Sequence, residues 1–114
     1  GSRLISKLLV PMLQLNENVI LDKKDIARAE ALSKQKNQHI NDAMNTVRFQ
    51  KAQFVAEKLA TLLQSGKLKK YDTSTATSKP WANAVDRAFT KDILEPLGIK
   101  PSSDITFNRL QTIN

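Results

Sequence analysis

The run over residues 40–65 constrains the fold of this chain most, because its apolar side chains point in two directions. At about 100° per residue, one direction collects Ile40, Ala43, Met44, Val47 and Phe54. A wider arc, turned by roughly a third of a circle, collects Phe49, Ala52, Val55, Ala56, Leu59, Ala60, Leu62 and Leu63. A helix with two apolar faces is either covered on both sides or interrupted between them. The run therefore predicts a long central helix.

The residues that follow this run indicate where it ends. Gly66 suits the left-handed position that closes many helices, and Leu68 can fold back on the last turn. Residues 67–79 are then rich in Lys, Ser and Thr and show no apolar pattern. They predict a mobile, basic, Ser/Thr-rich loop.

A shorter helix is predicted before the central one. Asp22 suits an N-cap, and Asp25 adds negative charge to the first turn. The stripe that follows consists of Ile26, Ala29, Leu32 and Ser33. Residues 34–39 are polar throughout and favour a break, although one continuous helix over 22–65 is the alternative. The caps then available to the central helix are Asn41 and Asp42.

The N-terminal part predicts a helix over residues 3–15. Pro11 lies inside its apolar pattern, so a kink or a split is expected there. A polar turn at 16–18 and an extended apolar link at 19–21 follow. Gly1 and Ser2 resemble the remnant of a cleaved tag and are left out of the fold.

Two further helices are predicted near the C-terminus. Pro80 starts the first of them, and Glu95–Pro96 ends it. Its apolar face consists of Trp81, Ala84, Val85, Ala88 and Phe89, so Trp81 is assigned to the core. A last short helix, with a strand as the alternative, would bury Phe107, Leu110 and Ile113. The candidate caps for it are Ser102, Ser103 and Asp104.

Together these elements predict one all-α domain over residues 3–114. The architecture expected is a small bundle of four to five helices, or a fragment of an α-solenoid, with at most a minor strand. No run of apolar residues is long enough to span a bilayer, so no membrane contact is expected. Cysteine is absent, which excludes disulfides and, with the lack of a targeting segment, suggests an intracellular protein.

The sequence offers no equipment for catalysis. His39 is the single histidine. The sequence contains neither a cysteine nor a Gly-x-Ser-x-Gly turn, so it shows no nucleophile that His39 would activate as a base. One imidazole without thiolates cannot fill a zinc site, and the glycines of a phosphate-binding loop are missing. We therefore expect no enzyme activity, no catalytic or metal-ligating residue and no cofactor. Asp92 falls on the apolar face of its helix, so it lies either in an exposed last turn or in an ion pair or functional site.

The first functional hypothesis is a non-catalytic helical module, part of a larger protein or complex, that binds a partner protein. The apolar stripe of the central helix that has few partners within the chain is the candidate contact. Its residues are Ile40, Met44, Val47 and Phe54. Phe54 is the anchor expected there, and a second copy of the chain is an alternative occupant.

The second hypothesis is a basic domain that contacts the phosphate backbone of DNA or RNA. The net charge is +7 and the pI is about 9.9, which suits a polyanion. The central helix would contribute Arg48, Lys51 and Lys58. The loop after it would contribute Lys67, Lys69, Lys70, Tyr71 and Lys79. Either Tyr71 or Trp81 is the ring that would stack on a base, with the core assignment of Trp81 as its alternative.

Overall fold

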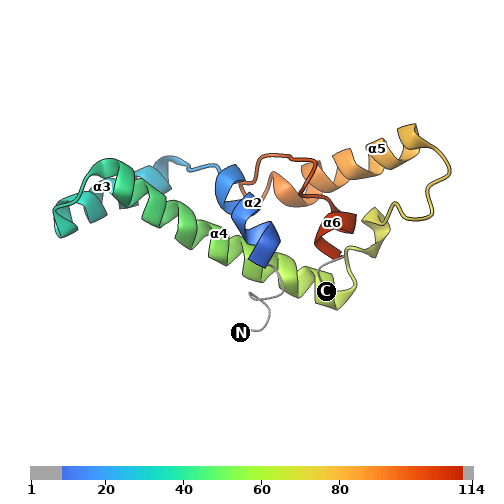
Figure 1. Ribbon diagram of the computed structural model, residues 1–114, viewed down its shortest axis with the longest axis horizontal. Helices are drawn as coiled ribbons and strands as arrows, with labels where there is room; N and C mark the ends of the chain where they lie inside the picture. The colour runs from blue at the N-terminus through green and yellow to red at the C-terminus, as the bar shows by residue number, and fades with distance from the viewer. Residues whose placement is uncertain (1–8, 112–114) are drawn as a thin grey trace.

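The computed structural model describes residues 9–111, with side chains from Leu13 onward. This part of the chain holds five α-helices and no strand, so the predicted all-α fold with a long central helix is confirmed. The elements are α2 (Leu9–Asn18), α3 (Lys23–Lys36), α4 (Ile40–Ser65), the 3₁₀ turn η1 (Lys69–Tyr71), α5 (Lys79–Phe89), the π-helical turn η2 (Thr90–Leu94) and α6 (Phe107–Gln111). Figure 1 shows an elongated body in which α4 underlies the other helices.

Helix α4 carries two separate cores, which explains its two apolar directions. At its N-terminal end it packs on α3 around Ala29, Ala43 and Val47. Farther along it enters a larger core with α2, α5, η2 and α6, whose largest fully buried members include Leu15, Leu59, Phe89, Leu94 and Leu110. Burial of such side chains is the main stabilising contribution in a domain of this size. Apart from Phe49 and Phe54, the two stripes are therefore largely covered, at different places along one helix.

Two aromatic residues do not follow the predicted arcs. Phe49 was expected in the wider arc, but half of its surface is exposed where α4 passes from one core to the other. Trp81 was expected in the core and is 49% exposed. The assignment of Trp81 is wrong because the core reaches only the C-terminal end of α5, where Phe89 is buried. Figure 1 shows the start of α5 at the far end of the molecule, away from α4.

The predicted break before α4 is confirmed, so residues 22–65 form two helices. Asn37 ends α3 in the left-handed conformation with φ of 49°. His39 caps α4, because its Nδ1 accepts a hydrogen bond from the backbone N–H of Asn41 at 3.0 Å. The caps expected at Asn41 and Asp42 are therefore wrong by two to three residues. At the other end Gly66 has φ of 79°, as predicted.

The start of α3 is fixed by a reciprocal cap. The Asp22 side chain accepts a hydrogen bond from the N–H of Asp25, and the Asp25 side chain accepts one from the N–H of Asp22. This capping box satisfies two donors that a helix start otherwise leaves free. The link before it is extended, as predicted, and Val19 pairs with Ile99 in an isolated bridge. Residues 16–18, expected as a turn, instead complete α2.

The remaining N-terminal predictions lie partly outside the described residues. Pro11 lies within α2, but the residues before Leu9 are not described, so the predicted kink or split stays a prediction.

The C-terminal segment is helical rather than a strand. Phe107 and Leu110 are buried in the larger core. The hydroxyl of Thr106 accepts a hydrogen bond from the N–H of Arg109 at 3.2 Å, so the expectation of a cap at residues 102–104 is wrong. Ile113 lies outside the described residues.

Candidate functional site

The apolar stripe proposed for a partner is divided by the fold. Val47 is 2% exposed, and Ile40 and Met44 pack half-buried around the same small core against α3. Phe54 is different, because 59% of its surface is exposed. Of the four candidate partner residues, the structure therefore leaves Phe54 as the one that is largely free of intramolecular cover.

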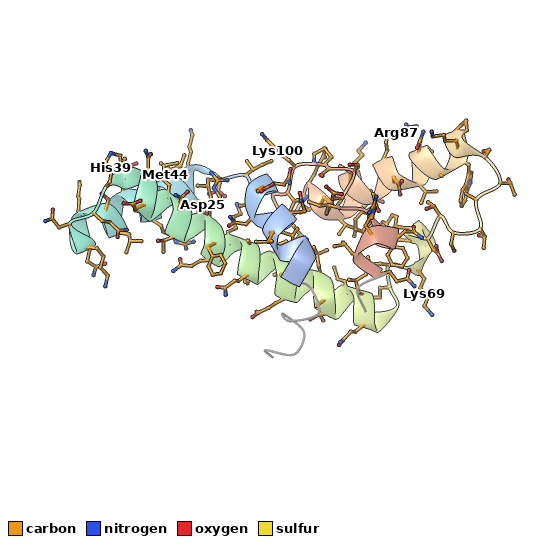
Figure 2. The ribbon with its side chains drawn as sticks, in the orientation of Figure 1. Asp25, His39, Met44, Lys69, Arg87 and Lys100 are labelled. Carbon is orange, nitrogen blue, oxygen red and sulfur yellow. The ribbon has the colours of Figure 1, made fainter. Side chains whose placement is uncertain are left out.

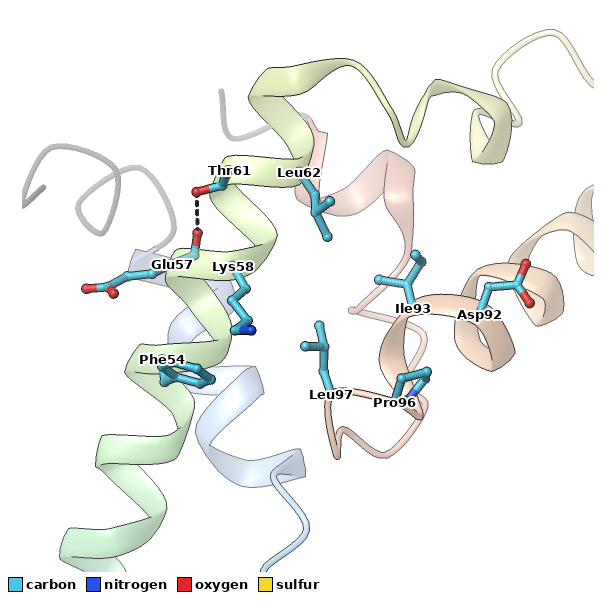
Figure 3. A pocket seen from close by; sticks show the side chains of 9 residues that line it. All are labelled: Phe54, Glu57, Lys58, Thr61, Leu62, Asp92, Ile93, Pro96 and Leu97. Atoms are coloured by element: carbon cyan, nitrogen blue, oxygen red, sulfur yellow. Dashed lines mark hydrogen bonds between the residues drawn. The ribbon is translucent and has the colours of Figure 1, made fainter.

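Phe54 lies at the edge of a groove between α4 and the segment that follows α5. The groove has a volume of about 580 Å³ and is lined by Phe54, Glu57, Lys58, Thr61, Leu62, Asp92, Ile93, Pro96 and Leu97. Figure 3 shows Leu62, Ile93 and Leu97 pointing into the space between the two walls. From Phe54 to Leu62 the groove follows about 12 Å of α4, since an α-helix rises 1.5 Å per residue.

Charges flank the apolar floor of this groove. In Figure 3 the carboxylates of Glu57 and Asp92 lie on opposite sides and point away from the floor. The ammonium of Lys58 lies 4.8 Å from the centroid of the Phe54 ring, within the range of a cation–π contact. The lining of the groove therefore carries two carboxylates and one ammonium, and the ammonium is held against the Phe54 ring, although the chain as a whole is basic.

Asp92 is held in place by the only tyrosine. The hydroxyl of Tyr71 donates a hydrogen bond of 2.9 Å to Asp92 Oδ2. The Tyr71 ring is 4% exposed and meets Phe89 edge to face, with centroids 5.3 Å apart. Burial, together with the hydrogen bond to Asp92 and the charge of Asp92, raises the pKa of Tyr71 above 10.0. Asp92 is an exposed residue whose side chain anchors η1 to η2, and among the described residues it has no ion-pair partner.

Two of the candidate phosphate-binding residues are already engaged within the chain. Arg48 donates to the backbone oxygen of Val19 at 2.7 Å. Lys51 donates to the backbone oxygen of Ile20 and to Asp25 Oδ2, each at 2.7 Å. These side chains hold the link at 19–21 against α4, so neither is presented to a ligand.

The other basic candidates are exposed but lie in different places. Lys58 belongs to the groove, whereas Lys67, Lys69, Lys70 and Lys79 lie around η1 and the start of α5. Lys70 lies 5.4 Å from the Tyr71 ring centroid. Since Tyr71 is buried, its ring is not available to stack on a base, which removes it from the proposed nucleic-acid contact.

The segment predicted as a mobile loop is attached to α6 along its first half. Asp72 accepts a hydrogen bond from Asn108 Nδ2 at 2.9 Å, and Asn108 Oδ1 accepts from the N–H and hydroxyl of Thr73. Within the segment, Leu68 and Tyr71 are buried in the larger core, 2% and 4% exposed. The hydrogen bonds that residues 74–78 make within the described chain all join groups no more than four residues apart.

The sequence does not predict the second wall of the groove, which contains Ile93, Pro96 and Leu97. The wall is formed where η2 leads into Pro96 and Leu97, and its position depends on the π-helical turn. Within that turn the N–H of Glu95 donates to the oxygen of Thr90 at 2.8 Å, five residues back. In the sequence Glu95–Pro96 indicates only a helix stop, and no local pattern there indicates that Ile93 and Leu97 share a wall with Pro96.

The described residues contain neither a cluster that suits a metal nor a helix that suits a bilayer. Over residues 9–111 no three His, Cys, Asp or Glu side chains gather closely enough to hold a metal ion. None of the helices in that range is both long and apolar enough to cross a membrane. Compared with known protein families, curated proteins and solved structures, the chain matches none of them.

Proposed function

We propose that this chain is a non-catalytic interaction module that binds an amphipathic helix of a partner protein in the groove between α4 and η2. The observation that supports this most is the exposure of Phe54 at the edge of an apolar groove that no described side chain fills. Helix-in-groove recognition uses apolar anchors at spacings of three, four and seven residues. A groove about 12 Å long accommodates two turns of such a helix.

The charge at the margins specifies the kind of helix. Glu57 and Asp92 flank the floor on opposite sides, so basic residues beside the apolar stripe of the partner would meet a carboxylate at either edge. Opposite charges at the rim favour one class of partner and speed association. The proposed partner is therefore a helix with an apolar stripe and basic flanks, and the intracellular location expected from the sequence is part of the same proposal.

A selection from displayed helical peptides tests this function. Peptides with a fixed apolar stripe and randomised flanking positions are selected on the wild-type chain. Enrichment of Lys and Arg at the flanks is expected. Binding of the selected peptides, measured by isothermal titration calorimetry, should weaken at least about thirtyfold in Phe54→Ala, the loss typical of an anchor residue.

Phe49→Ala provides the matched control. Phe49 lies on the same helix and is 50% exposed, but it does not line the groove, so its removal should leave peptide binding unchanged. Equal binding by wild type and Phe54→Ala would contradict the proposal. A dimer in sedimentation experiments that dissociates in Phe54→Ala would instead assign the groove to a second copy of the chain.

A further inference from the structure

The end of the molecule opposite the α3–α4 turn concentrates positive charge. Residues 67–91 contain six basic side chains and two acidic ones, which gives +4 of the total of +7. The basic residues are Lys67, Lys69, Lys70, Lys79, Arg87 and Lys91. Figure 2 places Lys69 and Arg87 at the end far from His39 and Met44.

The positive charges at this end are not neutralised within the described chain. The salt bridges of Asp25 with Arg28 and Lys51 lie at the other end of the molecule and involve none of these basic residues. Asp72 is occupied, because its carboxylate accepts hydrogen bonds from Ser74 and Asn108. Lys67, Lys69 and Lys79 are exposed and have no carboxylate partner among residues 9–111.

Trp81 is the exposed aromatic residue of the same end. Its indole is 49% exposed and lines a hollow of about 280 Å³ together with Thr75, Ala76, Thr77 and Ser78. Three of these neighbours carry hydroxyl groups, which donate hydrogen bonds to phosphate and sugar oxygens. Lys79 directly follows the hollow in the sequence.

We propose that this end of the molecule binds single-stranded nucleic acid, with a base stacked on Trp81 and the phosphates contacted by Lys69, Lys70 and Lys79. An exposed aromatic ring within a positive surface is how proteins bind single strands without reading their sequence. Of the two rings that the sequence offers for stacking, Tyr71 is buried and Trp81 is exposed, so the contact uses Trp81 alone. Arg48 and Lys51 are not involved, because both are bonded within the chain.

The surroundings of Trp81 favour a nucleic acid over an anionic membrane. A membrane-binding surface inserts several apolar side chains together. The other large, exposed apolar side chains of the described residues lie on α2, α3, α4 and the link between α2 and α3: Leu13, Ile20, Ile26, Phe49 and Phe54. Trp81 instead shares its hollow with the hydroxyl side chains of Thr75, Thr77 and Ser78, and Lys79 lies two residues before it in the sequence.

The fluorescence of Trp81 tests the proposal directly, because it is the only tryptophan. Titration with an oligothymidylate of about 12 nucleotides, within the usual site size of such proteins, should quench the fluorescence saturably. With three phosphate contacts, the logarithm of the binding constant should fall with the logarithm of salt concentration with a slope of about −2. No quenching at low salt would overturn the proposal.

Variants separate stacking from charge. With a labelled oligonucleotide and anisotropy as the readout, Trp81→Leu should weaken binding between about fivefold and about 150-fold, while Trp81→Phe keeps most of it. The triple change of Lys69, Lys70 and Lys79 to Gln should weaken binding and flatten the salt dependence. Circular dichroism verifies that each variant is folded.

A second triple variant, with Lys24, Lys34 and Lys36 changed to Gln, removes the same charge from α3 at the opposite end. It should bind like wild type, and an equal loss in both triple variants would overturn the localised site. Equal binding of inorganic polyphosphate and of the oligonucleotide would overturn the stacking contact. A blue shift of Trp81 fluorescence with phosphatidylglycerol vesicles, without any response to the oligonucleotide, would assign the surface to membranes and overturn the proposal.

Discussion

Lys51 Nζ lies 2.7 Å from Asp25 Oδ2 at the place where the start of α3 meets the middle of α4. Both side chains are largely buried, with 17% and 9% of their surfaces exposed. Asp25 also caps the N–H of Asp22, and Lys51 also holds the oxygen of Ile20. One ion pair therefore fixes where α3 begins, how the preceding link runs and how α3 lies on α4.

Removal of the ammonium should destabilise the protein strongly. Lys51→Met keeps most of the unbranched apolar stem but leaves the Asp25 carboxylate buried without its partner, which costs about 3 kcal/mol. The free energy of unfolding, measured with urea, gives the value. Arg28→Ala is the control, because Arg28 is 3.6 Å from Asp25 but its side chain is 56% exposed, and such pairs contribute less than about 1 kcal/mol. Equal losses in both variants would contradict this assignment.

The same pair makes stability depend on pH in the acidic range. Burial raises the pKa of Asp25, but the hydrogen bond from Lys51, the N–H of Asp22 and the charge of Lys51 together hold that pKa below 3.8. A lowered pKa in the folded state means that the stabilisation is present above pH 3.8 and is lost as the pH falls through the folded-state pKa. Urea unfolding between about pH 5 and about pH 2 should show this loss. Asp25→Asn should be less stable at neutral pH, and its free energy of unfolding should depend less on pH in this range.

Gly98 should be less tolerant of a side chain than Gly66, although both have φ of +79°. A left-handed conformation costs an alanine about 1–2 kcal/mol at either position. At Gly98 the added Cβ would also lie 3.2 Å from Lys51 Nζ, whereas at Gly66 its nearest neighbour is Lys69 Cε at 3.9 Å. Gly98→Ala should therefore lose more stability to urea than Gly66→Ala. The difference should shrink in a Lys51→Met background, and a difference that persists there would exclude Lys51 as its cause.

The hydroxyl of Tyr71 should lose its proton only above pH 10.0, and this ionisation should reduce the stability of the fold at high pH. Burial and the contact with Asp92 raise its pKa above 10.0, so the protonated form is favoured in the folded state. The stabilisation is full below pH 10.0 and is lost as the pH rises through the folded-state pKa. Ultraviolet absorbance of tyrosinate follows this titration in the folded protein. Tyr71→Phe should cost about 1 kcal/mol at neutral pH and should remove the alkaline dependence.

Two phenylalanines should respond in opposite ways to truncation. Phe54→Ala should change the free energy of unfolding by less than about 0.5 kcal/mol, because the side chain is mostly exposed. Phe89→Ala should cost about 3–5 kcal/mol, because that ring is fully buried between Tyr71 and the rest of the core. Thermal unfolding followed by circular dichroism compares the two. A large loss in Phe54→Ala would place Phe54 in the core and remove the anchor proposed for a partner.

The sequence predicts where the helices begin and end better than it predicts which of their side chains are buried. Asp22, Pro80 and Gly66 mark helix ends by local chemistry, and the structure uses each of them at or within one residue of the end. Trp81 and Phe49 share helical faces with buried residues and are nevertheless exposed. Periodicity gives the direction of a side chain but not how far along the helix its cover extends.

The two candidate sites depend on long-range contacts that no local sequence pattern indicates. From the sequence, Arg48 and Lys51 are predicted to be available to a ligand. Their hydrogen-bond partners lie 26 to 31 residues away along the chain, at Val19, Ile20 and Asp25, so no local pattern indicates them. The wall of the groove requires a π-helical turn, for which the residues of η2 carry no distinctive signature. Phe54 was identified because it deviates from the wider arc, and this deviation is what leaves it exposed.

The π-helical turn also determines what kind of genetic change the groove tolerates. The turn holds one residue more than an α-helical turn, because the N–H of Glu95 donates to the oxygen of Thr90, five residues back. Loss of one residue within Thr90–Leu94 would therefore leave an α-helical turn with the wall at Pro96 and Leu97 still directed toward Phe54, whereas an added residue would turn that wall by about 100°. An in-frame deletion of a single codon there is a change that the groove tolerates, and a single-codon insertion is one that removes it.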